Sequence, residues 1–272
     1  METGALVGRY VVVDRIGLQG WGTVYTAFDP ELDRKVALKI SPAPVADARD
    51  GDEPPDDARY RRLLREARVM AQINHPNAVA VHDVGEHDGR VFVTMEKVVG
   101  LTLDEWRLER PRTWSEVIEV FVAAGRGLAA AHDVGLVHRN FGPRSIVVAA
   151  DGHVHVTDFG LARLSDRGSS VAEPGLELTA DDGFATGVGA RGAVDEALRY
   201  MAPERRHTAD AAAADQFSFC VALYEALYRE HPFGEQSVAE QQLRAAAGRL
   251  PSAPTERSVP ERIRLAVLRG LS

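Results

Sequence analysis

The sequence contains one cysteine, three lysines and no long hydrophobic run. Cys220 alone cannot form a disulfide within the chain or supply a cysteine-based zinc site. No apolar stretch approaches the ~18 residues that span a bilayer, and the N-terminus lacks the basic start of a signal peptide. The net charge of −8 argues against a general binder of nucleic acid or anionic membranes. We therefore expect a cytoplasmic protein with no nucleic-acid partner and no membrane segment in this chain.

The pattern of residues changes near position 98, and 272 residues suffice for two lobes with a buried core. Before that position, apolar and polar residues alternate between glycines and turn residues, which is typical of antiparallel strands. After it, apolar residues recur at helical spacing. We predict an α+β fold with a β-rich N-lobe over residues 1–98, including one helix over 58–73, and an α-rich C-lobe over 99–272.

Local patterns give finer predictions within each lobe. Residues 41–57 are rich in proline and acidic side chains and are expected to form an exposed loop. Further strands are predicted over residues 78–84, 90–97, 145–149 and 154–157, and helices over 117–131 and 215–227. Residues 165–197 show no period and are expected to form a flexible loop.

Lysine is scarce in this chain, so the position of Lys39 on a predicted strand needs an explanation. The strand follows a glycine cluster, and Glu66 lies on the predicted helix that comes next. A strand lysine paired with a helix glutamate can hold a cation against nucleotide phosphates. The alternative is a surface ion pair of little energetic value. The glycine cluster alone is weak support, because such clusters mostly mark tight turns.

Taken in order, the motifs of the chain resemble those of the protein kinase family, and of bacterial Ser/Thr kinases in particular. The resemblance extends from about Arg9 to the C-terminus. The motifs are Ile16-Gly, Gly22-Thr-Val-Tyr, Val36-Ala-Leu-Lys39, Glu66, His75-Pro-Asn, Met95-Glu, His138-Arg-Asn, Asp158-Phe-Gly, Met201-Ala-Pro-Glu204 and Asp215-Gln-Phe-Ser. The resemblance implies the bilobal protein kinase fold.

The resemblance also implies a cleft that binds ATP. Lys39 would contact the α- and β-phosphates and pair with Glu66, and Asp158 would bind Mg²⁺. The adenine would be surrounded by residues of both lobes and of the segment between them. These and the glycines of the phosphate loop are Ile16, Gly17, Gly20, Gly22, Val24, Ala37, the gatekeeper Met95, the backbone of Glu96 and Val98, and Val147.

Two further sets of residues match structural parts of the family. Met70, Val81, His138 and Phe159 match a stacked apolar column that couples the lobes. Asp215 matches the aspartate that holds the catalytic loop from beneath.

The sequence departs from the family where phosphoryl transfer takes place. Asn140 replaces the aspartate that orients the substrate hydroxyl and accepts its proton, and losing such a base typically costs on the order of 10²–10⁴-fold in rate. Gly142 replaces the lysine that steadies the γ-phosphate, and Ser145 replaces the asparagine that binds a second Mg²⁺. Because Asp158 is the remaining strong ligand, we expect weak use of Mg²⁺.

Two more departures agree with these. Gln19 stands at the family's second glycine, and Ala197 replaces a threonine that bridges to the catalytic loop. Several losses favour decay of catalysis, which predicts a pseudokinase that binds ATP and acts as a regulatory or scaffolding module in signalling. The alternatives are a weakly active Ser/Thr protein kinase and a diverged small-molecule phosphotransferase, although Asn140 and Ser145 weaken the last equally.

A protein partner is expected at the segment from Asp158 to Glu204 and at a helix near 237–248, although this segment could equally be a relaxed remnant. Arg139 matches the arginine that, in related kinases, contacts a phosphorylated residue of that segment. The chain ends before the arginine that would pair with Glu204 and before the family's last helices. This leaves open whether the C-lobe is short or the protein longer.

The histidines do not suggest a metal site. No cysteine, aspartate or glutamate lies near His132, His153, His155 or His207 at a metal-binding spacing. They are expected to be solvated or structural.

Overall fold

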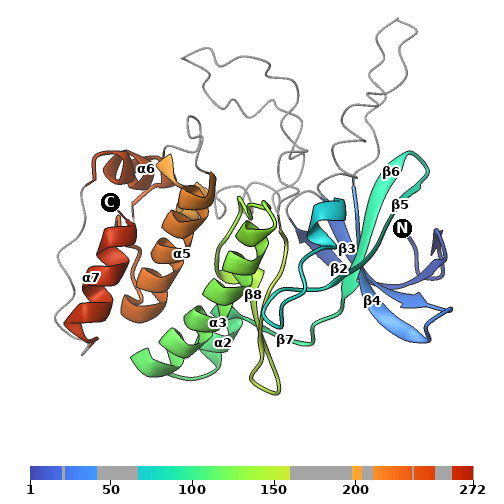
Figure 1. The fold of residues 1–272 in the computed structure, drawn as a ribbon, viewed down its shortest axis with the longest axis horizontal. Coiled ribbons are helices and arrows are strands. Elements are labelled where there is room, and N and C mark those ends of the chain that lie inside the picture. The colour runs from blue at the N-terminus through green and yellow to red at the C-terminus, as the bar shows by residue number, and fades with distance from the viewer. Residues whose placement is uncertain are drawn as a thin grey trace, which may run out of the picture.

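The computed structural model describes residues 1–19, 22–41, 67–159, 198–203, 211–234, 236–248 and 259–271. These residues form a sheet-based N-lobe and a mainly helical C-lobe that lie next to each other (Figure 1). The fold is α+β and bilobal, as predicted. No helix among these residues is long and apolar enough to cross a membrane.

The N-lobe contains a six-stranded antiparallel sheet in the order β1-β2-β3-β4-β6-β5. Because successive side chains of a strand point to opposite faces, the register divides the sheet into two faces. One face packs into a core that includes Tyr25, Leu38 and Phe92. The strands are β1 (Leu6–Val7), β2 (Tyr10–Gln19), β3 (Gly22–Asp29), β4 (Arg34–Ile40), β5 (Val81–His87) and β6 (Arg90–Glu96).

The C-lobe begins with a three-stranded sheet in the order β7-β8-β9. Helices follow from sequence signals at their ends: Thr113 caps α3 and forms a reciprocal capping box with Glu116. The apolar positions of α3, such as Phe121, face α5, which is apolar almost all round and buried. The elements are β7 (Gly100–Thr102), α2 (Leu103–Glu109), α3 (Trp114–Asp133), η1 (Pro143–Ser145), β8 (Ile146–Ala149), β9 (Val154–Val156), α5 (Ala211–Tyr228), α6 (Val238–Ala246) and α7 (Glu261–Gly270).

Asn77, in the turn after the N-lobe helix, is bound to the C-lobe. Its side-chain amide donates to the Val154 carbonyl at 2.8 Å, and its own carbonyl accepts from the Val156 N–H at 2.9 Å. Gly127 of α3 makes this approach possible, because a Cβ there would lie 2.1 Å from the Asn77 carbonyl oxygen. The turn therefore packs against backbone of both β9 and α3.

Several predicted boundaries were wrong: α3 begins at Trp114 and α5 at Ala211, both earlier than predicted, and two further boundaries differ as follows. The helix predicted to reach Ile73 is helical over residues 67–70, and its end tightens into i→i+3 hydrogen bonds at Gln72 and Ile73. The strand predicted over 78–84 instead covers Val81–His87, because Ala78 pairs with Val156 of the C-lobe. The predicted loops over 42–57 and 165–197, and residues 58–66 of the helix, lie outside the described residues.

Candidate nucleotide-binding and catalytic site

Lys39 and Asp158 join the two lobes at the centre of the site. Lys39 lies on β4, is 2% exposed, and its ammonium is 2.6 Å from Oδ1 of Asp158, which follows β9. Burial is the largest influence and acts to raise the pKa of the Asp158 carboxyl, but the charge of Lys39 and its hydrogen bond act together against burial, and the pKa is lowered. The Asp158 carboxyl is therefore ionised at neutral pH.

The apolar residues expected around an adenine lie on the same face of the N-lobe sheet as Lys39. The register pairs Val24 with Lys39 and Ala37 with Met95, and cross-strand partners share a face. Val24 and Met95 are buried, and Ala37 is half-buried. This face is opposite the N-lobe core, so it is turned toward the C-lobe and the ion pair.

Other members of the predicted adenine site differ in exposure. Ile16 is 51% exposed on β2. Val98, between β6 and β7, and Val147, on β8 of the C-lobe, are half-buried. The Glu96 N–H donates to the Ala80 carbonyl at 2.8 Å, so this N–H is already used within the protein. A ligand edge at this position would have to use other backbone groups of the segment.

The glycine loop is described at both of its ends. Gly17 pairs with Val24, and Gly22 begins β3. A Cβ at Gly22 would lie 2.4 Å from the Ile40 carbonyl oxygen, so the close strand pairing requires glycine. Gly20, the side chain of Gln19, Glu66, Ala197 and Glu204 lie outside the described part of the chain, and with them the predicted Lys39–Glu66 pair.

Asp215 of α5 holds the catalytic loop through backbone hydrogen bonds. Its carboxylate is 1% exposed and accepts from the His138 N–H at 2.6 Å and the Arg139 N–H at 2.7 Å. His132 Nε2 lies 2.8 Å from the same carboxylate. Because Arg139 has a φ of 65°, the loop adopts a conformation that few non-glycine residues favour, and these bonds stabilise it.

Members of the predicted apolar column lie in or against the large core that includes residues of both lobes. His138 and Phe159 have ring centroids 5.1 Å apart, and Met70 and Val81 belong to or pack against the same core. The His138 ring accepts from the Asn140 N–H at Nδ1 and donates from Nε2 to the Thr157 carbonyl at 2.8 Å. Burial lowers the pKa of His138, so the ring is neutral.

The three altered catalytic positions lie together on the loop after His138. Ser145 is 4% exposed, and its hydroxyl donates to the Gly142 carbonyl at 2.8 Å while accepting from the Gly142 N–H at 3.1 Å. A Cβ at Gly142 would lie 3.3 Å from the ring of Tyr200, which leaves a side chain there little room. Asn140 is half-buried. The Ser145 hydroxyl is therefore turned into the loop itself.

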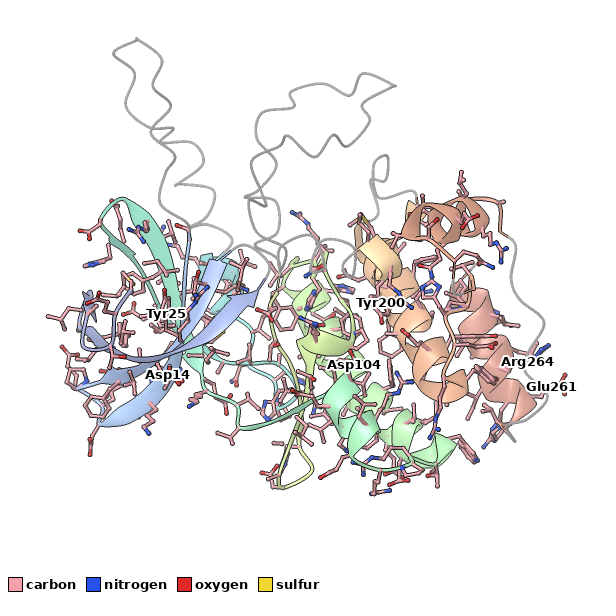
Figure 2. The ribbon with its side chains drawn as sticks, turned by 180° about the vertical axis from the view of Figure 1, so that it is seen from behind. Asp14, Tyr25, Asp104, Tyr200, Glu261 and Arg264 are labelled. Carbon is pink, nitrogen blue, oxygen red and sulfur yellow. The ribbon has the colours of Figure 1, made fainter. Side chains whose placement is uncertain are left out.

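Two contacts around this loop were not predicted from the sequence. Tyr200, beside α5 in Figure 2, donates its hydroxyl to Glu225 at 2.6 Å, which holds the ring against Gly142. Phe141 places its ring 5.5 Å from that of His138 and 5.6 Å from that of Phe219. Phe141 could have been found, because a large apolar ring in a loop needs a packing partner.

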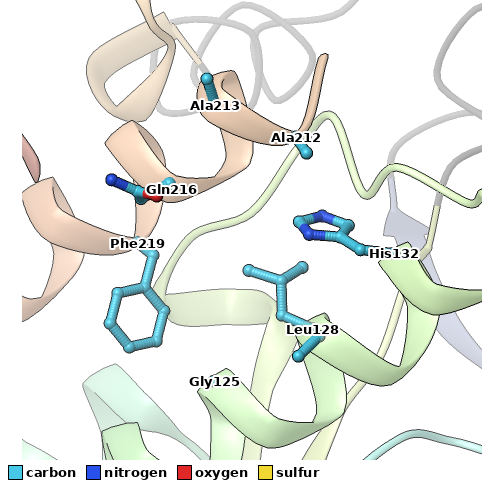
Figure 3. Close-up of a pocket in the computed structure, with 8 residues that line it drawn as sticks. Gly125, Leu128, His132, Ala212, Ala213, Gln216 and Phe219 are labelled. Atoms are coloured by element: carbon cyan, nitrogen blue, oxygen red, sulfur yellow. The ribbon is translucent and has the colours of Figure 1, made fainter. Parts of the chain in front are cut away.

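A cavity of about 340 Å³ lies away from this site, between α3 and α5 (Figure 3). Its walls are mostly small or apolar, and Leu128 and Phe219 are among them. His132 lines the cavity and contacts Asp215, so one side chain connects it to the catalytic loop.

Residues 10–265 match the family profile described as the protein kinase domain. This chain belongs to the protein kinase family. It is 36% identical over 250 residues to the serine/threonine-protein kinase PknL of Mycobacterium bovis, covering 90% of this chain and 56% of that protein. It is 34% identical over 249 residues to the serine/threonine-protein kinase PknB of Mycobacterium tuberculosis, covering 88% of this chain and 36% of that protein. The kinase-like chain thus spans about half or less of the length of these curated relatives.

Proposed function

We propose that this kinase-like domain binds ATP, transfers phosphate poorly or not at all, and acts as a regulatory or scaffolding module in signalling. Binding is supported by the buried Lys39, which presents a cation between the lobes, and by the apolar face that carries Val24, Ala37 and Met95. The ion pair of Lys39 and Asp158 links the two lobes. A nucleotide that contacts Lys39 would therefore contact a side chain whose position depends on how the two lobes are arranged.

The state of Ser145 carries the proposal of impaired transfer. Phosphoryl transfer depends on positioning and on charge stabilisation by a base, a cation and metal ligands. Here the base position holds the amide Asn140, the lysine position holds Gly142, and the hydroxyl of Ser145 is bonded to Gly142. Restoring one of these groups would leave the other two missing.

A second candidate function is a weakly active Ser/Thr protein kinase. It is favoured by the relatives, which are named serine/threonine-protein kinases at 34–36% identity. It is also favoured by Asp215, because the catalytic loop is still held by the hydrogen bonds described above. The same observations fit a domain that keeps the loop for structural reasons.

A signalling role without chemistry requires that nucleotide binding changes the population of two lobe arrangements. The core that includes Met70 and Val93 of the N-lobe and Phe159 of the C-lobe supplies a packed connection between the lobes. We propose that a partner contacts α6, where Leu243 is 71% exposed, together with the segment between Asp158 and Glu204.

Two measurements on the purified protein test the function. ATP at millimolar concentration should raise the melting temperature, and Lys39→Met should abolish the shift. Lys35→Met is the matched control, because Lys35 is an exposed lysine on the same strand. Radiolabelled ATP should give no transfer to the protein or to a generic acceptor. Absence of any shift would refute ATP binding, and robust autophosphorylation would favour the second candidate.

A further inference from the structure

The divalent cations that the family uses can be tested against the donor groups of this cleft. Mg²⁺ takes oxygen ligands in a near-octahedral arrangement, usually carboxylates together with phosphates and water. Within the described ranges of the chain, no three His, Cys, Asp or Glu side chains are grouped so that they could hold a metal ion. The two protein positions to examine are therefore Asp158 and Ser145, which stand where the family has its metal ligands.

Ser145 does not fit the role of a metal ligand. Its hydroxyl hydrogen is directed to the Gly142 carbonyl, and its oxygen accepts the Gly142 N–H. A cation at this buried hydroxyl would compete with the Gly142 N–H for the same oxygen, and turning the side chain toward the cation would break the two bonds that close its turn and leave the Gly142 N–H without its acceptor. The donor set at this position does not fit the second cation that the family carries.

Asp158 is engaged by a cation that belongs to the protein. The Lys39 ammonium contacts one of its carboxylate oxygens at 2.6 Å, and Lys39 is almost completely buried in the middle of a six-stranded sheet. A divalent ion that approached Asp158 would be repelled by this ammonium at short range. The same ammonium can donate to phosphate oxygens, because a lysine has three N–H donors.

We infer that the site around Lys39 and Asp158 binds a nucleoside triphosphate without requiring a divalent cation, with Lys39 as the positive charge that the phosphates meet and with Asp158 as an ion-pair partner of Lys39. This inference rests on the proposed ATP binding. It assigns to Lys39 the neutralisation of phosphate charge, to which metal ions contribute in the family. The sequence predicted weak use of Mg²⁺, whereas this inference states that Mg²⁺ is not needed for binding. The buried ammonium of Lys39 would then balance the negative charge of both Asp158 and the phosphates of the ligand.

The unmodified protein provides the deciding measurement. ATP is titrated by calorimetry in excess Mg²⁺ and again in EDTA, at equal ionic strength so that screening is matched. We expect dissociation constants that agree within about threefold. A loss of affinity of more than about tenfold in EDTA would overturn the inference while leaving ATP binding intact. Absence of binding in both buffers would instead overturn the proposed function.

Two variants test the roles of the charges. In EDTA, Asp158→Asn should bind ATP as tightly as the unmodified protein or more tightly, because a carboxylate beside unmetallated phosphates is repulsive. In Mg²⁺ it should also bind without loss, whereas a role as metal ligand would weaken binding in Mg²⁺ alone. Lys39→Met should weaken binding about tenfold or more in both buffers, and Lys35→Met in neither. Loss in Mg²⁺ alone for Lys39→Met would contradict the assignment.

Discussion

The N-lobe face of the cleft and the catalytic loop differ in how much of the family's transfer apparatus they keep. The N-lobe face retains Lys39, which is buried and paired across the lobes with Asp158. The catalytic loop carries Asn140, Gly142 and Ser145 at the positions where the resemblance to the family implies a base, a lysine and a metal ligand. Asp215 and His138, which support the same loop, are present and fully hydrogen-bonded to backbone. The residues that match the family are those with buried ionic or hydrogen-bonded partners, and this contrast is what the pseudokinase proposal predicts.

The largest expected effect is on stability, at the support of the loop. Asp215→Ala would leave the N–H groups of His138 and Arg139 without their acceptor in the protein interior, and we expect a loss of about 4 kcal/mol in the free energy of unfolding. Urea denaturation measures it. Asp133→Ala, an exposed aspartate at the end of α3, should change stability by less than about 0.5 kcal/mol. If both variants changed the free energy of unfolding by similarly small amounts, the hydrogen bonds of Asp215 to the loop would not contribute to stability.

A pair of glycines on α3 tests the contact between the N-lobe turn at Asn77 and the C-lobe. Gly127→Ala would place a Cβ 2.1 Å from the Asn77 carbonyl oxygen, so the turn or the helix must shift. We expect destabilisation by about 2 kcal/mol in thermal or urea unfolding. Gly125→Ala is the matched control, because its Cβ would meet Phe219 at an ordinary 3.5 Å. It should be neutral or stabilise by up to about 1 kcal/mol through helix propensity.

The neutral His138 predicts a pH dependence of stability. Its pKa in the folded state is lowered by burial, so the unfolded chain binds a proton near its ordinary value of 6.5 while the folded chain does not. Stability is therefore complete above pH 6.5 and falls as the pH drops below it, by up to about 1.4 kcal/mol per pH unit. Urea midpoints between pH 7.5 and 5.5 would measure the slope. His138→Gln should flatten it, and an unchanged slope would assign it to other groups.

Phe141 tests whether the altered loop is merely relaxed or is packed in a new way. Phe141→Leu keeps an apolar side chain and removes the ring contacts with His138 and Phe219. We expect a loss of about 1 kcal/mol in the free energy of unfolding. A stabilised variant would show that Phe141 strains the loop.

The smallest expected effect is on phosphate transfer. Asn140→Asp restores a base, but Gly142 and the bonded hydroxyl of Ser145 remain, and such parts act as a unit. Radiolabelled transfer should stay undetectable. If Asn140→Asp alone gave measurable transfer, the missing carboxylate would be the main reason for the lack of activity. The changes at Gly142 and Ser145 would then contribute little to it.

The sequence predicted most of what depends on local period. Alternation predicted β3 and β4, and the helical spacing around Phe121 predicted α3. The chain positions of Lys39 and Asp158 could be found from their motifs. Their contact joins residues 119 positions apart, and no local pattern encodes it.

The misses have the same physical origin. β5 begins later than predicted because Ala78 pairs with Val156 of the other lobe. Such a long-range contact cannot be predicted from local strand propensity. The direction of the Ser145 hydroxyl depends on the turn that it closes, and the ring of Tyr200 is set by Glu225 on another helix. Such side-chain directions follow from tertiary packing.

The attachment of Asn77 determines how the cleft can open. The turn after the N-lobe helix is bound to β9 and pressed against α3, whereas β4 and its Lys39 belong to the N-lobe sheet. A swing of the sheet would therefore leave the end of the helix behind with the C-lobe. The turn at Asn77 is thus mechanically part of the C-lobe, although its place in the sequence assigns it to the N-lobe.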